Sequence, residues 1–141
     1  MLLILTLPAI AFATLGGDES SVQADQAHMR ASVRVTHAAA YAVHELQTPA
    51  GHVIREYVSP SGTVFAVAWQ GPSKPDMRQL LGTHFDEYMQ AATPAQRHGH
   101  GPLVIQTPDL VLVSAGHMRA FSGKAYLPQM LPAGVRPESI Q

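Results

Sequence analysis

The chain has 141 residues, of which 46% are hydrophobic and only 13% are charged. This length suits a single domain, and the apolar content excludes the disordered class of low hydrophobicity and high charge. The formal net charge is −1 and the nine Lys and Arg residues are spread singly, which argues against a nucleic acid as partner. Because the chain has no cysteine, disulfides, thiol catalysis and thiolate metal sites are excluded as well.

The N-terminus has the pattern of a cleavable signal peptide. Residues 2–12 form an apolar run that closes on Ala11-Phe12-Ala13, the small-x-small pattern that signal peptidase cleaves. We expect cleavage after Ala13, which would remove residues 1–13 and leave residues 14–141 as one exported domain.

This pattern predicts a periplasmic or secreted protein. The apolar run is shorter than the roughly 20 residues that a membrane-spanning helix needs, so no transmembrane anchor is expected after cleavage. No Lys or Arg precedes the run, although signal peptides normally begin with a positive segment, so we expect the natural start to lie upstream of Met1.

A short helix is predicted first in the exported domain. Ser20 and Gln23 have the spacing of a capping box, which predicts a helix from there to about Ala31. Its apolar face holds only Val22 and Met29, so we expect the helix to be peripheral.

From Val33 the hydrophobic pattern changes to a period of two, which predicts strands. Two similar segments, Thr48-Pro49-Ala50-Gly51 and Ser59-Pro60-Ser61-Gly62, each place Pro and Gly as a tight turn requires. The sequence therefore predicts an antiparallel meander with strands at about Ala40–Gln47, His52–Val58 and Thr63–Gln70.

The third of these strands has no polar residue between positions 64 and 69, which is typical of a central strand covered on both faces. The following segment supplies a cover, because apolar residues recur at helical spacing from Met77 to Ala92, behind a capping box formed by Ser73 and Asp76. Gly82 inside this helix costs about 1 kcal/mol relative to Ala, which we attribute to close packing by another element.

Strands are expected again at Leu103–Gln106, Leu110–Ser114, His117–Phe121 and Lys124–Leu127, and the tail from Pro128 is expected to cross the sheet as an irregular strap. The predicted fold class is α+β, with an antiparallel meander sheet of about five to seven strands, one amphipathic helix packed across it and a short N-terminal helix.

The candidate metal ligands are His98 and His100, two imidazoles in one polar, glycine-rich loop that together could hold Zn²⁺ or Cu²⁺. A metal site needs a third ligand, which His84 or His117 could supply only if the fold brought it close. The ordinary interpretation is a pair of solvated histidines, and we expect no other cofactor.

No catalytic set is evident. Ser114-Ala115-Gly116-His117 lacks the leading glycine of a nucleophile elbow, and the neighbouring carboxylates Asp86 and Glu87 fall on the polar face of the predicted helix. The neighbouring Arg55 and Glu56 are explained by ion pairs on a sheet face. We therefore predict that the protein is not an enzyme.

Several stretches resemble one known family. They are Leu15-Gly16-Gly17-Asp18, the block from Arg55 to Pro72, Leu80-Leu81-Gly82 and the segment from Gly116 to Phe121. Together they are similar to short exported proteobacterial proteins known only as the domain of unknown function numbered twenty-eight forty-four. The resemblance spans nearly all of the exported domain and implies export and a shared fold, but no activity, cofactor or catalytic residue.

The leading functional hypothesis is a non-enzymatic domain that binds another envelope protein or envelope component through its sheet or a sheet edge. The alternative is a carrier of a small ligand or metal, which would use either the His98/His100 loop or a pocket between helix and sheet. A hydrolase ranks third.

Overall fold

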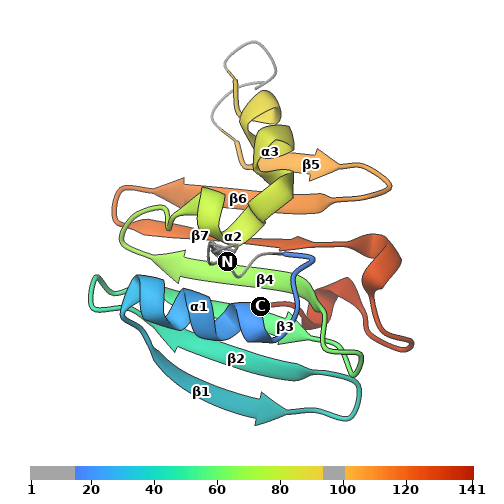
Figure 1. The fold of residues 1–141 in the computed structure, drawn as a ribbon. Coiled ribbons are helices and arrows are strands. Elements are labelled where there is room, and N and C mark those ends of the chain that lie inside the picture. Colours follow the sequence, from blue (N-terminus) through green and yellow to red (C-terminus); the bar gives the residue numbers. More distant parts are fainter. Residues whose placement is uncertain (1–14, 94–100) are drawn as a thin grey trace, which may run out of the picture.

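A computed structural model describes residues 15–93 and 101–141, so the segment predicted as signal peptide lies outside the described residues. The fold is α+β, as predicted: one seven-stranded antiparallel sheet with helices on one face (Figure 1). The strands are β1 Ser32–His37, β2 Ala42–Gln47, β3 Val53–Val58, β4 Val64–Gly71, β5 Leu103–Gln106, β6 Val111–His117 and β7 Ala120–Tyr126. The helical elements are α1 Ser20–Met29, α2 Met77–Leu81, α3 Phe85–Ala91 and the 3₁₀ turns η1 Gly82–His84, η2 Pro128–Met130 and η3 Pro137–Ser139.

The sheet consists of two meanders, β1 to β4 and β5 to β7, joined where β4 pairs with β7 in the order β1-β2-β3-β4-β7-β6-β5. Strand β4 is therefore central, which confirms the prediction drawn from its lack of polar residues. Its Val67 and Trp69 face the helices, whereas Phe65, Ala66 and Ala68 belong to a second buried cluster on the opposite face.

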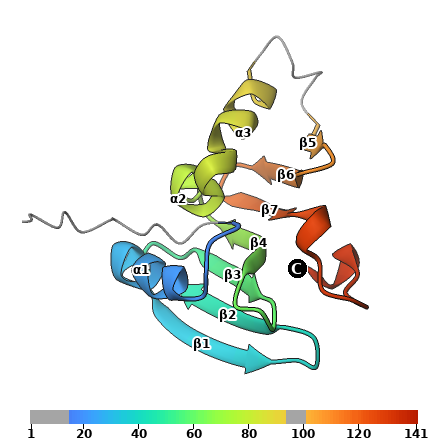
Figure 2. The same ribbon diagram turned by 45° about the vertical axis from the view of Figure 1, so that its right-hand side comes forward.

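The helices cover one face and the C-terminal segment covers the other (Figure 2). On the helix side, α1 lies across β2 and β3 (Figure 1), and α2 and α3 pack over the C-terminal meander. Helix α1 lies on the outside of this layer with most of its residues at least partly exposed, and its Val22 and Asp25 are buried against the sheet.

The segment after β7 forms the strap expected from the sequence. Its Ile140 is buried with Phe65 and Tyr57, and the Tyr57 hydroxyl both accepts from Gln141 N and donates to Gln141 O, each at 3.0 Å. The Lys124 ammonium donates to the carbonyls of Pro137 and Ile140 at 3.0 and 3.2 Å. These bonds hold the strap against the sheet.

Neither helix start is capped by the serine that the sequence suggested: α2 has Asp76 as its N-cap, and the N-cap of α1 is Glu19, which makes no side-chain cap bond. At α1, Asp18 Oδ1 accepts from Ser21 N at 3.2 Å and from the Ser20 hydroxyl, so Ser20 is a donor and not the cap. At α2, Asp76 Oδ1 accepts from Gln79 N at 3.1 Å. An aspartate satisfies the free N–H groups of a first turn as well as a serine does, so spacing alone did not identify the cap.

The helix predicted from Met77 to Ala92 is broken at Gly82. This glycine has φ 53° and ψ −120°, which ends α2 and turns the chain into η1 and α3. The glycine is thus required by its positive φ and not by close packing of another element, which corrects the sequence interpretation.

The strands expected at 117–121 and 124–127 are in fact one strand, β7. The hairpin between β6 and β7 turns at Met118 and Arg119, where the sequence analysis placed the interior of a strand. Arg119 adopts φ 62° there. The two Pro-Gly turns are confirmed, with Gly51 N bonded to Thr48 O at 3.0 Å and Gly62 N to Ser59 O at 2.9 Å.

Candidate functional site

Strand β1 is the first edge of the sheet, and within residues 15–93 and 101–141 no strand pairs with its outer side. Ala38 N donates to Tyr41 O at 2.8 Å and closes the β1–β2 hairpin, which sets the alternation of bonded and non-bonded pairs along the two strands. In this register, the peptide groups of Arg34 and Thr36 bond to β2, and those of Val33, Val35 and His37 point away from the sheet. They form a row of outward donors and acceptors on which a further strand can pair, and we call it the open edge.

The open edge carries one charged residue, Arg34, but few other features that protect an edge strand against strand addition. Its six residues include no proline and no lysine, and its pairing with β2 runs without a bulge. Val35 is 43% exposed on this strand. The other edge strand, β5, is only four residues long and contacts α3. Strand β1 is therefore the more accessible of the two sheet edges.

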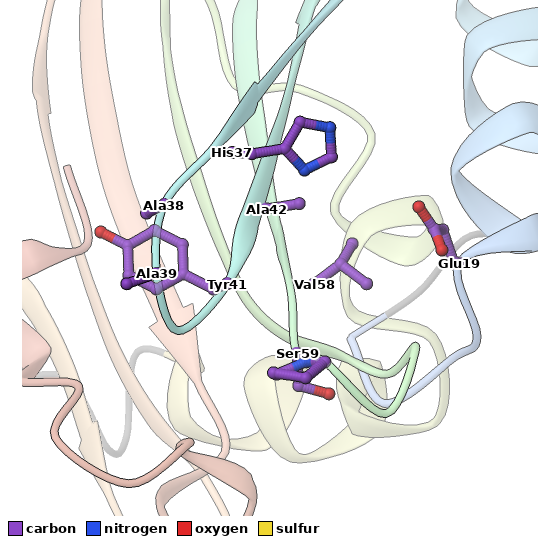
Figure 3. A pocket seen from close by; sticks show the side chains of 9 residues that line it. Glu19, His37, Ala38, Ala39, Tyr41, Ala42, Val58 and Ser59 are labelled. Carbon is purple, nitrogen blue, oxygen red and sulfur yellow. The ribbon is translucent and has the colours of Figure 1, made fainter.

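A pocket of about 280 Å³ lies at the end of the open edge. Figure 3 shows Glu19 entering it from the segment before α1 and His37 from β1, with Ala42 and Val58 between them. Its lining is completed by Ala38, Ala39, Tyr41, Ser59 and Pro60. A bond from Glu19 N to Gly62 O at 2.8 Å fixes the backbone of Glu19 against the β3–β4 turn, beside the pocket.

A row of polar side chains leads from this pocket into the core. Glu19 Oε1 lies 3.3 Å from His44 Nε2, and His44 is directly opposite Glu56 in the β2–β3 register. Glu56 is 1% exposed and is hydrogen-bonded to Asp25, which is 0% exposed. The Gln79 amide donates to Asp25 Oδ1. Four elements, α1, β2, β3 and α2, thus meet at buried polar groups.

The buried carboxyls of Asp25 and Glu56, which we call the acid pair, are hydrogen-bonded to each other, which requires that at least one of them is protonated. Burial, the hydrogen bond to Asp25 and the charge of Asp25 hold the pKa of Glu56 well above its usual range. Because Gln79 donates to Asp25, the proton belongs on Glu56, whose hydroxyl then donates to the Asp25 carboxylate. Both side chains of the acid pair are closed to solvent.

The acid pair was not predicted from the sequence. Arg55 and Glu56 were both expected in sheet-face ion pairs, which holds for Arg55, bonded to Glu45 at 2.9 Å, but not for the buried Glu56. The signal in the sequence was the two-residue period of a strand, which puts Glu56 on the same face as the apolar Ile54 and Val58, and all three are buried. Asp25 carried a similar signal, three residues after Val22 on the same side of α1.

The pKa of Glu45, on the opposite face of the sheet, is shifted in the opposite direction from that of Glu56. Burial alone would raise the pKa of Glu45, but hydrogen bonds from Gln47 and Arg55 and the charges of Arg55 and Arg34 outweigh burial, so its pKa is lowered. Arg34 reaches Glu45 at 3.2 Å. Arg34, Glu45 and Arg55 thus form the sheet-face ion pairs that the sequence pattern predicted, but the acid in them is Glu45 and not Glu56.

The predicted metal ligands His98 and His100 lie outside the described residues. Of the suggested third ligands, His84 lines a depression with Glu87 and Asp109 at the start of β6, whereas His117 stands at the far end of that strand. The fold therefore does not bring His84 and His117 together. Across residues 15–93 and 101–141, no three His, Asp or Glu side chains are grouped so that they could hold a metal ion.

Within the same two ranges, no helix combines the length and the apolar character that crossing a membrane requires.

Comparison with known proteins identifies the family but no characterised relative. The family model described as "Protein of unknown function (DUF2844)" matches residues 11–140. No curated protein and no solved structure shows significant similarity to the chain. Since the match covers nearly the whole sequence, the chain belongs to the DUF2844 family of proteins of unknown function.

Proposed function

We propose that this protein is a non-enzymatic binding domain of the bacterial cell envelope that takes up an extended segment of another envelope protein along β1. The observation that supports this most directly is the open edge, where the peptide groups of Val33, Val35 and His37 point outward from a strand without proline, lysine or bulge. Strand addition uses such an edge for affinity and the neighbouring side-chain pockets for specificity. The location in the envelope is supported by the N-terminal export pattern alone.

The pocket beside His37 gives the proposed site a chemical preference. Side chains of an added strand alternate between the two faces, so a residue opposite His37 on the helix side reaches the pocket. Glu19 is the acid among the lining residues and its side chain is exposed, so a lysine or arginine of the partner would meet a carboxylate there.

The test combines a cross-linker with a variant that blocks strand addition. A photo-activated cross-linking residue replaces Val33, and the protein is irradiated in living cells with either Val35→Pro or Val35→Thr added. Proline removes an outward N–H that the sheet does not use, so the fold tolerates it, but a partner strand loses its bond. Threonine is the matched control, because it keeps both the N–H and a β-branched side chain.

We expect one discrete cross-linked product that Val35→Pro reduces at least tenfold and Val35→Thr leaves intact. Glu19→Gln should weaken the same product if the partner places a basic side chain in the pocket. A product that is equally strong with Val35→Pro, or the absence of any product, would show that β1 is not the binding edge.

A further inference from the structure

Helix α1 is attached to the sheet by very few side chains. Its buried residues are Ser21, Val22 and Asp25, and its one other apolar contact is the partly buried Met29. Asp25 is the one ionisable residue among these contacts, and it links α1 to Glu56 of β3 and Gln79 of α2. The contact of α1 with the sheet therefore responds to the protonation of the acid pair.

From this arrangement we propose that the acid pair is a proton-dependent latch, which fastens α1 to the sheet when one proton is shared and releases it when that proton is lost. The proposal goes beyond the binding function of β1 and does not depend on it. With the proton present, the Asp25 carboxylate accepts from both the Glu56 hydroxyl and the Gln79 amide. Without it, two carboxylates touch in a buried site, and their repulsion and desolvation favour moving Asp25 out with α1.

Two side chains lie opposite Glu56 on the neighbouring strands. The residues opposite on neighbouring strands are Val67 of β4, which is apolar, and His44 of β2. His44 is already engaged with Glu19 at 3.3 Å. At the other end of α1, His28 and Asp76 lie 3.9 Å apart with exposed side chains and form a pair of their own.

The direction of the pH response follows from linkage. Glu56 has a raised pKa with α1 attached and regains an ordinary value once α1 leaves. The attachment is therefore complete below the ordinary glutamate pKa and weakens as the pH rises toward the raised value. For one proton, the equilibrium constant for α1 release increases about tenfold per pH unit across that window and is constant above it.

The direct measurement is hydrogen–deuterium exchange of the intact protein at a series of pH values, corrected for the intrinsic pH dependence of amide exchange. Peptides from α1 should lose protection about tenfold per pH unit, whereas peptides from β3, β4 and β7 should stay protected. Constant protection of α1 at every pH would overturn the latch.

Substitutions assign the response to the acid pair. Glu56→Gln keeps a donor to Asp25 without an ionisable proton, so α1 should stay protected at every pH. The exposed Glu138→Gln is the matched control and should respond like the wild type. If His44→Gln abolishes the response and Glu56→Gln does not, the sensor is the His44–Glu19 pair and the latch is refuted.

A second measurement needs no variant. In the wild-type protein, the side-chain carboxyl carbon of Glu56 can be followed by NMR, and its titration midpoint should coincide with the loss of α1 protection. A midpoint in the ordinary glutamate range would exclude the latch even if Glu56→Gln failed to fold. The protection of α1 is measured without any partner, so a negative result there does not affect the proposal for β1. Likewise, the absence of a cross-linked product does not affect the latch.

Discussion

Trp69, the single tryptophan of the chain, depends on a glycine on the neighbouring strand. It is 3% exposed, and its ring lies over Gly123, its register partner on β7. A Cβ added to Gly123 would lie 2.4 Å from Trp69 Cζ2 and 2.7 Å from the Val113 carbonyl oxygen. The absence of a side chain at Gly123 therefore lets the indole pack directly against β7. Because Val113 O belongs to the backbone of β6, it cannot move aside for an added Cβ as a side chain could.

Gly123→Ala is expected to lower the free energy of unfolding by about 1–3 kcal/mol, the usual cost of overpacking a core. Urea unfolding followed by Trp69 fluorescence measures this directly. Gly101→Ala is the control, because an added Cβ there meets nothing within 4 Å. Equal stability of the two variants would show that the indole can move aside.

Among the elements, the break between α2 and α3 has the clearest cause. Gly82 stands in a region of φ and ψ that side chains avoid, and it redirects the chain so that Leu80, Leu81 and Tyr88 all reach the core. A straight helix would turn part of this set away from the sheet.

Gly82→Ala should therefore destabilise the protein by about 1–3 kcal/mol, although alanine is normally the better helix former. Thr83→Ala, an exposed neighbouring change, should alter stability by less than about 0.5 kcal/mol. Thermal unfolding followed by circular dichroism compares the two. A stabilised Gly82→Ala would mean that the bend is not needed for packing.

The elements that could be predicted from the sequence are those with a strong local signal. The Pro-Gly turns and the all-apolar β4 were placed correctly, because such residues restrict the backbone or require cover whatever surrounds them. The turn at Met118 and Arg119 was missed, since neither residue type favours a turn and only pairing of β6 with β7 imposes it. The acid pair was missed for the same reason, because its two carboxyls meet through tertiary contacts.

At the scale of the whole molecule, Glu45 and Glu56, on opposite faces of the sheet, make the stability of the fold depend on pH in opposite directions. Glu45, with a lowered pKa, contributes stability above the ordinary value of 4.5, and this is lost as the pH falls through the lowered pKa. Glu56, with a raised pKa, has the opposite sign, so stability falls as the pH rises from 4.5 toward the raised value. Stability should accordingly be greatest in mildly acidic solution.

Urea unfolding between strongly acidic and mildly alkaline pH should therefore give a maximum, with a slope on the alkaline side of at most about 1.4 kcal/mol per pH unit. Glu56→Gln should flatten the alkaline side, and Glu45→Gln should flatten the acidic side. A maximum at neutral pH that neither variant moves would contradict this assignment.

The pairing of β4 with β7 also has a consequence for how the chain folds. The bonds within each meander join neighbouring strands, but Ala66 pairs with Tyr126 across the whole second half of the chain. Until β7 has been synthesised, β4 is the outer strand of an incomplete sheet. Its apolar faces are then incompletely covered, and the peptide groups that later bond to β7 have no partner strand. The closing of the sheet is thus a late, non-local step, and a nascent chain that ends before β7 exposes its most aggregation-prone strand.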